Sequence, residues 1–115
     1  MTRYNPAKQK VREHYSDLWT SAFSRLGKAG YVLGFPHVPD LFLHVTGESA
    51  EEGSAFRFTN DLEYATVWGS FDEAEGVASR KDLTLSGIRA RPVVLSDAAA
   101  RMIGHLNTLI TELER

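Results

Sequence analysis

The stretch FRFTNDLEYATVWGSFDEAEGVA, residues 56–78, decides the fold because it encodes a strand, a tight turn, a second short strand and a helix in succession. Its first four residues alternate apolar and polar side chains, a pattern typical of a half-buried strand. Ser70 and Glu73 have the spacing of a capping box, in which each side chain binds the backbone N–H of the other residue. This spacing predicts a helix over residues 71–80.

A capped turn connects the two strands of this stretch. Residues 59–61, Thr-Asn-Asp, carry side-chain oxygens that can accept the unpaired N–H groups at the start of a helical turn. We therefore expect one helical turn over residues 62–65 and an extended segment over residues 66–68. The side chains expected to fill the core are Leu62, Ala65, Trp68 and Phe71.

The composition is that of a single folded domain. A chain of 115 residues can bury one core unaided, and its 43% hydrophobic content includes six Phe, four Tyr and two Trp. The absence of cysteine excludes a disulfide framework, thiol catalysis and thiolate zinc sites, and it favours a reducing, cytoplasmic location. No run approaches the roughly 18 apolar residues of a membrane span, so we expect one domain over residues 1–115 and no membrane partner.

The net charge of −2 is unevenly distributed. Residues 1–30 carry six basic and two acidic side chains, whereas residues 31–87 carry three basic and ten acidic ones. This distribution can steer charged partners, but it differs from the strongly basic balance of an ordinary nucleic-acid-binding protein.

The clearest helix lies in the first 30 residues. Asn5 can cap it, Pro6 suits its first position, and Gly27 can supply the left-handed residue that ends it. Apolar residues at steps of three and four define its core face: Val11, Tyr15, Leu18, Trp19, Ala22, Phe23 and Leu26. The opposite, solvated face carries Lys8, Lys10, Arg12, Glu13 and Asp17.

Three strands are predicted besides the two in the opening stretch. Glycines and prolines after the first helix predict a loop with a short strand over residues 31–35. Residues 41–46 (LFLHVT) form a strand whose hairpin partner is residues 56–59. Residues 88–95 (IRARPVVL) include Pro92, which cannot donate a ladder hydrogen bond and therefore predicts an edge strand or a bulge.

The last predicted element is a second long helix, capped by Ser96 or Asp97. Its apolar seam consists of Ala99, Met102, Leu106, Leu109 and Leu113, widened by Ile103 and Ile110. The seam either packs on the sheet and the first helix, or its members Met102, Leu106, Leu109 and Leu113 meet a second copy of the chain in a homodimer.

These elements predict an α+β fold in the order α-β-β-α-β-α. We expect a small three- or four-stranded, mainly antiparallel sheet packed by the long N-terminal and C-terminal helices. The helix over residues 71–80 completes the layer.

The string FTNDLEYATVWGSFDEAE, residues 58–75, resembles the hairpin-and-capped-helix segment of many small phage and prophage proteins. This resemblance implies a role in binding a host protein, as anti-CRISPR proteins and other inhibitors of bacterial defence do. It implies no catalytic role for any of its residues.

Most catalytic signatures are missing from the sequence. It contains no Gly-rich phosphate loop, no G-x-S-x-G elbow and no H-E-x-x-H pair. His37, Asp40 and His44 could form a metal triad, but a proline-flanked loop and a strand give them no reason to converge. We therefore expect no metal and no cofactor.

One enzymatic alternative starts from His44-Val45-Thr46 followed by Phe58-Thr59-Asn60-Asp61 and Ala65. This pair is similar to the strand motif and the later Phe-Thr-x-Asp turn of small ADP-ribosyltransferases, where a His and a Thr or Ser hold the nicotinamide ribose. The family places a helix between the two motifs and a catalytic Glu on a later strand, and this sequence has neither. The expectation is therefore a protein that is not an enzyme.

Two surfaces are candidates for partner binding. Glu48, Glu51 and Glu52 lie in the hairpin connection, where they could contact a basic site on a protein partner. If Leu41, Leu43 and Val45 face inward, alternation turns a second set outward: Phe42, His44, Arg57, Arg89 and Arg91. That basic face with an aromatic residue could hold nucleic acid.

The sequence as a whole favours a non-enzymatic protein-binding module that inhibits a host or defence complex. A nucleic-acid-binding accessory protein is the second interpretation, and an ADP-ribosyltransferase-like enzyme is the third. An inhibitor and the immunity protein of a toxin both fit the first interpretation.

Overall fold

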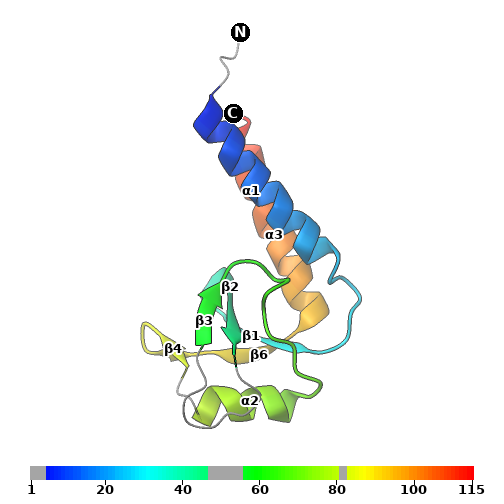
Figure 1. Ribbon diagram of the computed structural model, residues 1–115, viewed down its shortest axis with the longest axis vertical. Helices are drawn as coiled ribbons and strands as arrows, with labels where there is room; N and C mark the ends of the chain where they lie inside the picture. The colour runs from blue at the N-terminus through cyan, green and yellow to red at the C-terminus, as the bar shows by residue number, and fades with distance from the viewer. Residues whose placement is uncertain (1–4, 47–55, 81–82) are drawn as a thin grey trace.

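A computed structural model describes residues 5–46, 56–80 and 83–115 (Figure 1). The predicted α+β class is confirmed. The elements follow in the order α1 (Pro6–Phe23), β1 (Tyr31–Phe35), β2 (Val38–Val45), β3 (Phe56–Thr59), α2 (Phe71–Arg80), β4 (Thr84–Leu85), β5 (Ile88–Arg89), β6 (Arg91–Val94) and α3 (Leu95–Leu113). Among the described residues, none of the helices is long and apolar enough to cross a membrane. The acidic loop with Glu48, Glu51 and Glu52 lies outside the described residues.

Four strands form one antiparallel sheet in the order β3-β2-β1-β6. β1 is the strand predicted over residues 31–35, and β2 pairs with β3 as the predicted hairpin, with Leu43 opposite Phe58. β6 lies at the edge of the sheet, as Pro92 predicted. The strand predicted over residues 88–95 is divided, because Ala90 separates β5 from β6.

A small hairpin that the sequence did not predict joins α2 to β6. β4 and β5 pair antiparallel, with Leu85 opposite Ile88. The residues between them, Ser86 and Gly87, have φ angles of 54° and 79°. A two-residue hairpin turn of type I′ requires positive φ at both of these positions. Strands of two residues show no readable alternation, so only this turn could have indicated the hairpin.

α1 and α3 lie side by side in opposite directions, and their outer halves extend beyond the sheet (Figure 1). We call this helix pair the arm. Trp19 Nε1 donates a hydrogen bond to Asn107 Oδ1 (2.9 Å), and Lys8 Nζ donates one to the carbonyl oxygen of Arg115 (3.3 Å). The molecule is 56 Å long and 28 by 23 Å across. The prediction that both long helices pack on the sheet therefore holds for the inner half of α3, whereas α1 packs mainly on α3 and reaches the core through Leu18 and Ala22.

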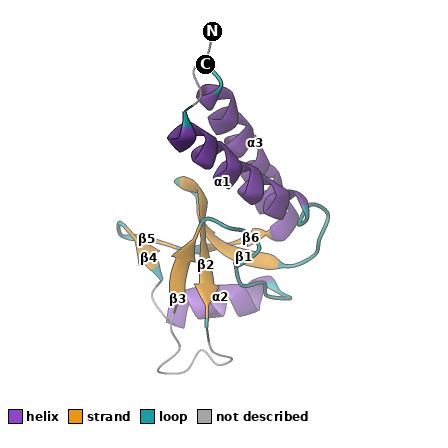
Figure 2. Ribbon diagram, turned by 45° about the horizontal axis from the view of Figure 1, so that its top comes forward, coloured by secondary structure: helices purple, strands orange, loops and turns teal. Residues whose placement is uncertain are grey.

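The sheet separates two apolar cores. One lies between the sheet and the arm, and the other lies between the sheet and α2, on the opposite side (Figure 2). The arm-side core consists of Leu18, Ala22, Val32, Phe42, Leu62, Ala65, Leu95, Ala98, Ala99, Met102 and Leu106. The α2-side core consists of Leu33, Phe35, Leu43, Ala74, Val77, Ala78, Leu83 and Ala90.

The two cores correct several predicted orientations. Phe42 was expected to face outward, yet it is fully buried in the arm-side core, because both faces of β2 are covered. Phe56 and Phe58 were expected to face inward, yet they are 43% and 42% exposed. Among the described elements, α2 packs on β1 and β6 and has no comparable contact with β3. Phe71, expected in the core, is half exposed, and its ring lies edge-on to that of Tyr31 with centroids 6.1 Å apart.

The residues predicted to form a homodimer seam lie mostly in the core of their own chain. Met102 and Leu106 are each 1% exposed and belong to the core of their own chain. Leu109 packs against the same core, and Leu113 is half-buried near the outer end of the arm. Only these last two residues of the seam remain accessible to a second copy.

The cap predicted at Asn5 is confirmed, the capping box of Ser70 and Glu73 is confirmed for one of its two hydrogen bonds, and the cap predicted at Ser96 or Asp97 is not found. Asn5 Oδ1 accepts the N–H groups of Ala7 (3.1 Å) and Lys8 (3.3 Å), and Ser70 Oγ accepts that of Glu73 (3.2 Å). α3 begins at Leu95, before the predicted caps, directly after β6. The buried Leu95 donates its N–H to the carbonyl oxygen of Gly30 (2.9 Å), a partner that no local pattern reveals. α1 ends at Phe23, four residues before the predicted terminator Gly27. Gly27 lies in the turn that follows the helix and has a φ of 76°.

Candidate functional site

The outer edge of β3 directs backbone groups away from the four-stranded sheet. On β2, the carbonyl oxygen of Leu43 accepts the N–H of Thr66 (3.1 Å), and the N–H of Val45 donates to Thr66 Oγ1 (2.8 Å). Leu43 and Val45 therefore direct their backbone groups away from β3. Because these groups alternate along a strand, the residues of β3 that bond to β2 are Arg57 and Thr59.

Phe56 and Phe58 consequently direct their N–H and C=O groups outward, away from the sheet. Within the described part of the chain, these outward groups make no backbone hydrogen bond. An edge of this kind is a template for pairing with another strand.

An aromatic row lies along the same edge. Phe56 and Phe58 share the face of Leu43 and Val45, and their rings meet edge-on with centroids 6.0 Å apart. The Phe58 ring lies 5.9 Å from that of Phe35, which is fully buried and fixes the row to the α2-side core. Partly exposed aromatic rings in a fixed position give a partner a large contact area at small entropic cost.

The opposite edge of the sheet is less suited to pairing. Tyr31 exchanges both backbone hydrogen bonds with Trp68 (2.9 and 2.8 Å), so its backbone groups point away from β6. By alternation and register, Pro92 and Val94 face outward on β6. Pro92 has no N–H to donate, and the chain enters α3 directly after Val94. The two edges therefore differ: Phe56 and Phe58 of β3 each direct an N–H group outward, whereas of the two outward residues of β6 only Val94 has one.

The ADP-ribosyltransferase-like residues have structural partners. His44 Nδ1 donates a hydrogen bond to the carbonyl oxygen of Tyr64 (2.6 Å), with the tautomer assigned from this contact. Thr59 Oγ1 accepts the N–H of Asp61 (3.0 Å), and Asp61 Oδ1 accepts that of Glu63 (3.0 Å). These side chains fix the turn over residues 62–65 against β2.

The three residues considered as a metal triad, His37, Asp40 and His44, have separate partners. Asp40 lies 3.6 Å from His105 of α3, His37 contacts the Phe35 ring edge-on at 5.9 Å, and His44 binds Tyr64. In residues 5–46, 56–80 and 83–115, no three ligand-type side chains gather in a metal-binding group.

The predicted basic face is distributed over separate parts of the molecule. Arg57 lies on the β3 edge, whereas Arg91 lies on β6 at the other edge, with two strands between them. Arg89 lies outside the four-stranded sheet, on β5, where its guanidinium is 3.0 Å from Glu75 of α2. Since Phe42 is buried as well, these residues do not form one continuous surface for nucleic acid.

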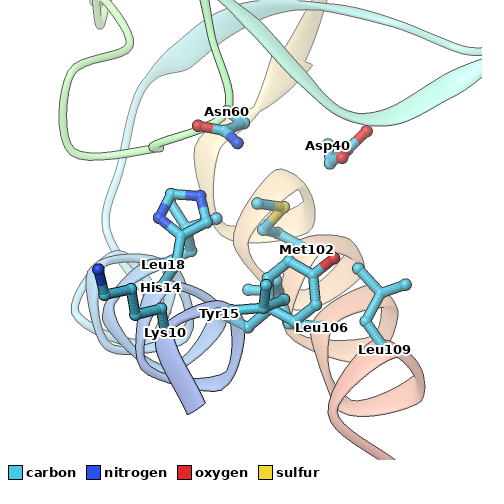
Figure 3. A pocket seen from close by; sticks show the side chains of 10 residues that line it. Lys10, His14, Tyr15, Leu18, Asp40, Asn60, Met102, Leu106 and Leu109 are labelled. Atoms are coloured by element: carbon cyan, nitrogen blue, oxygen red, sulfur yellow. The ribbon is translucent and has the colours of Figure 1, made fainter. Parts of the chain in front are cut away.

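A second candidate site is a groove of about 480 Å³ between the arm and the sheet (Figure 3). Its ten lining residues are Lys10, Val11, His14, Tyr15, Leu18, Asp40, Asn60, Met102, Leu106 and Leu109. The sequence assigned Lys10 to a solvated helix face, and only the approach of β2 and the Asn60 turn to the arm creates the groove. The three-and-four spacing of apolar residues in the two long helices indicated the apolar residues at the bottom of the groove. It gave no signal for the polar residues around its opening.

No protein-family model, curated protein or solved structure matches this chain.

Proposed function

We propose that the protein is a non-enzymatic protein-binding module that adds an extended segment of its partner to the edge of β3. The observation that carries this proposal is the pair of outward-facing backbone units at Phe56 and Phe58 beside two exposed rings. In strand addition, main-chain hydrogen bonds supply affinity and alternate side chains supply specificity. The β6 edge, where Pro92 lacks an N–H, is less suited to this mode than β3.

The side chains of β3 define the partner segment. Phe56 and Phe58 occupy one face, where apolar residues of an added strand would pack. Arg57 points to the other face and is exposed, and within the described residues no carboxylate pairs with it. The complementary segment therefore has an acidic residue between two apolar ones.

A second copy of β3 fits this edge poorly. Antiparallel pairing of two copies centred on Arg57 sets the two guanidinium groups directly opposite one another, and like charges in that position are destabilising. We therefore assign the edge to a different protein. The likeness of residues 58–75 to small phage and prophage proteins supports a host protein, such as a member of a defence complex, whose function this binding would inhibit.

The test is selection of a displayed library of random peptides on the purified protein, followed by titration of enriched peptides. We expect an alternating apolar–acidic–apolar pattern, and we expect the double variant Phe56→Thr, Phe58→Thr to weaken binding roughly tenfold or more. Threonine retains strand propensity, so the variant should keep its circular dichroism spectrum. The matched control Phe71→Ser removes another half-exposed ring and should leave peptide affinity unchanged.

A backbone variant separates strand addition from simple aromatic contact. Phe58→Pro removes one outward N–H that the sheet itself does not use, so the domain should fold while the peptide loses a hydrogen bond. Enriched peptides that bind the Thr double variant and the Pro variant as tightly as the wild type would overturn the proposal. Selection of peptides without alternation would do the same.

A further inference from the structure

We propose that the groove between the arm and the sheet binds a small amphiphilic carboxylate, a molecule with one anionic end and an apolar body. This site is separate from the β3 edge. Its volume of about 480 Å³ lies in the range of small-molecule sites, which is roughly 300–1,000 Å³.

The floor of the groove is apolar. Leu18, Met102 and Leu106 are 4%, 1% and 1% exposed, and they form the surface at which the two helices of the arm meet below β2. The half-buried side chains of Tyr15 and Leu109 continue this floor towards the outer part of the arm. A hydrocarbon body placed here would leave water on contact with five side chains that are themselves fixed by core packing.

The rim of the groove is polar, and its lysine and its carboxylate lie on opposite sides. Lys10 and His14 lie on the α1 side, while Asp40 lies across the groove on β2 (Figure 3). Asp40 has His105 as a neighbour at 3.6 Å. Lys10 has no carboxylate within 4.0 Å in the described part of the chain.

The arrangement of charge selects the ligand class. Among the described residues that line the groove, one lysine lies beside a histidine and the one carboxylate lies on the far side, which suits one negative charge at the α1 end of the ligand. A phosphate ester would lack the several converging donors that such groups need. A neutral apolar molecule would make no charge-assisted contact with Lys10 or His14. The ligand is therefore a monocarboxylate whose body lies along Leu18, Met102 and Leu106.

The experiment is a titration of the isotope-labelled protein with octanoate, monitored by the amide and Met102 methyl signals. Saturable shifts confined to groove residues are expected. Octanol, with the same chain and no charge, should bind about tenfold more weakly, and acetate should give no saturable shift. Octanoate shifts spread over the whole surface, or acetate binding as tight as octanoate binding, would overturn the proposal.

Two variants locate the charge. Lys10→Gln should weaken octanoate binding about tenfold and leave octanol binding unchanged, whereas Lys28→Gln, beyond the end of α1, should change neither. Equal octanoate affinity of both variants and the wild type would refute the assignment of Lys10. The double variant Phe56→Thr, Phe58→Thr should bind octanoate normally, so the outcome here is independent of that at the β3 edge.

Discussion

Gly30 is the residue at which three parts of the chain meet. Its φ is +118°, and its carbonyl oxygen accepts the first N–H of α3, from Leu95. A Cβ atom at this position would lie 2.6 Å from Val67 Cγ1 and 3.2 Å from the carbonyl oxygen of Trp68. The residue therefore needs both the conformational freedom and the small size of glycine.

Gly30→Ala should be among the most destabilising single changes in the protein. We expect it to lower the free energy of unfolding by about 2–4 kcal/mol, because backbone strain and overpacking act together. Gly87→Ala is the matched control, since its φ is also positive but its Cβ would meet open space. It should cost about 1 kcal/mol. Chemical denaturation measures both changes, and equal costs would show that the contact with Val67 is unimportant.

Single residues also show where sequence reasoning succeeds. Asn5 and Ser70 act on N–H groups two or three residues away, so their capping role follows from local spacing alone. The orientation of Phe42 does not follow in that way. Alternation along a strand separates two faces, but it does not reveal that each face is covered by a different helix layer.

At the scale of elements, a strand or helix could be predicted where its hydrophobic pattern is long or where Pro, Gly or a capping residue marks its end. The pairing of β2 with β3 and the edge position of β6 follow from alternation and from Pro92. The hairpin of β4 and β5 is too short to carry a pattern, and the start of α3 depends on a hydrogen bond to Gly30. The β3 edge became a candidate site only when strand order and the directions of backbone groups were known.

The interior of α3 contains one residue that weakens it. Gly104 lies in the helix on an exposed face, and a Cβ there would meet nothing within 4 Å. Gly104→Ala should therefore raise the free energy of unfolding by about 0.5–1 kcal/mol, through higher helix propensity. The reciprocal control is Ala100→Gly, one turn earlier on the exposed side, which should lower it by a similar amount. A destabilised Gly104→Ala variant would mean that something packs on that face of the arm.

At the scale of the whole molecule, stability is concentrated near the sheet. The fully buried residues of the arm are Leu18 and Ala22 in α1, and Leu95, Ala98, Ala99, Met102 and Leu106 in α3. No residue of 6–12 or 109–113 is fully buried. The outer part of the arm is held by partly exposed side chains and exposed polar contacts, such as the 3.7 Å pair of Arg12 with Glu114, and exposed pairs contribute little.

Native-state hydrogen exchange should reveal this gradient. Amides of residues 18–23 and 98–106 should be protected about tenfold or more over those of residues 9–12 and 109–113, because the outer turns can open without disturbing either core. Exchange followed by NMR at several denaturant concentrations gives the opening free energies. Uniform protection along both helices would contradict the expectation and would indicate that a second copy of the chain covers the outer arm.

The position of the two ends of the arm also decides how the domain responds to mechanical force. The start of α1 and the end of α3 lie together at the far end of the arm (Figure 1). A force applied between these two ends acts across the helix pair in an unzipping geometry. It therefore breaks the contacts between α1 and α3 one turn after another, whereas a force in shear would load all of them together. The sheet, the β3 edge and α2 lie beyond the end of the arm at which the two helices join the sheet. They therefore bear force only after α1 and α3 have separated.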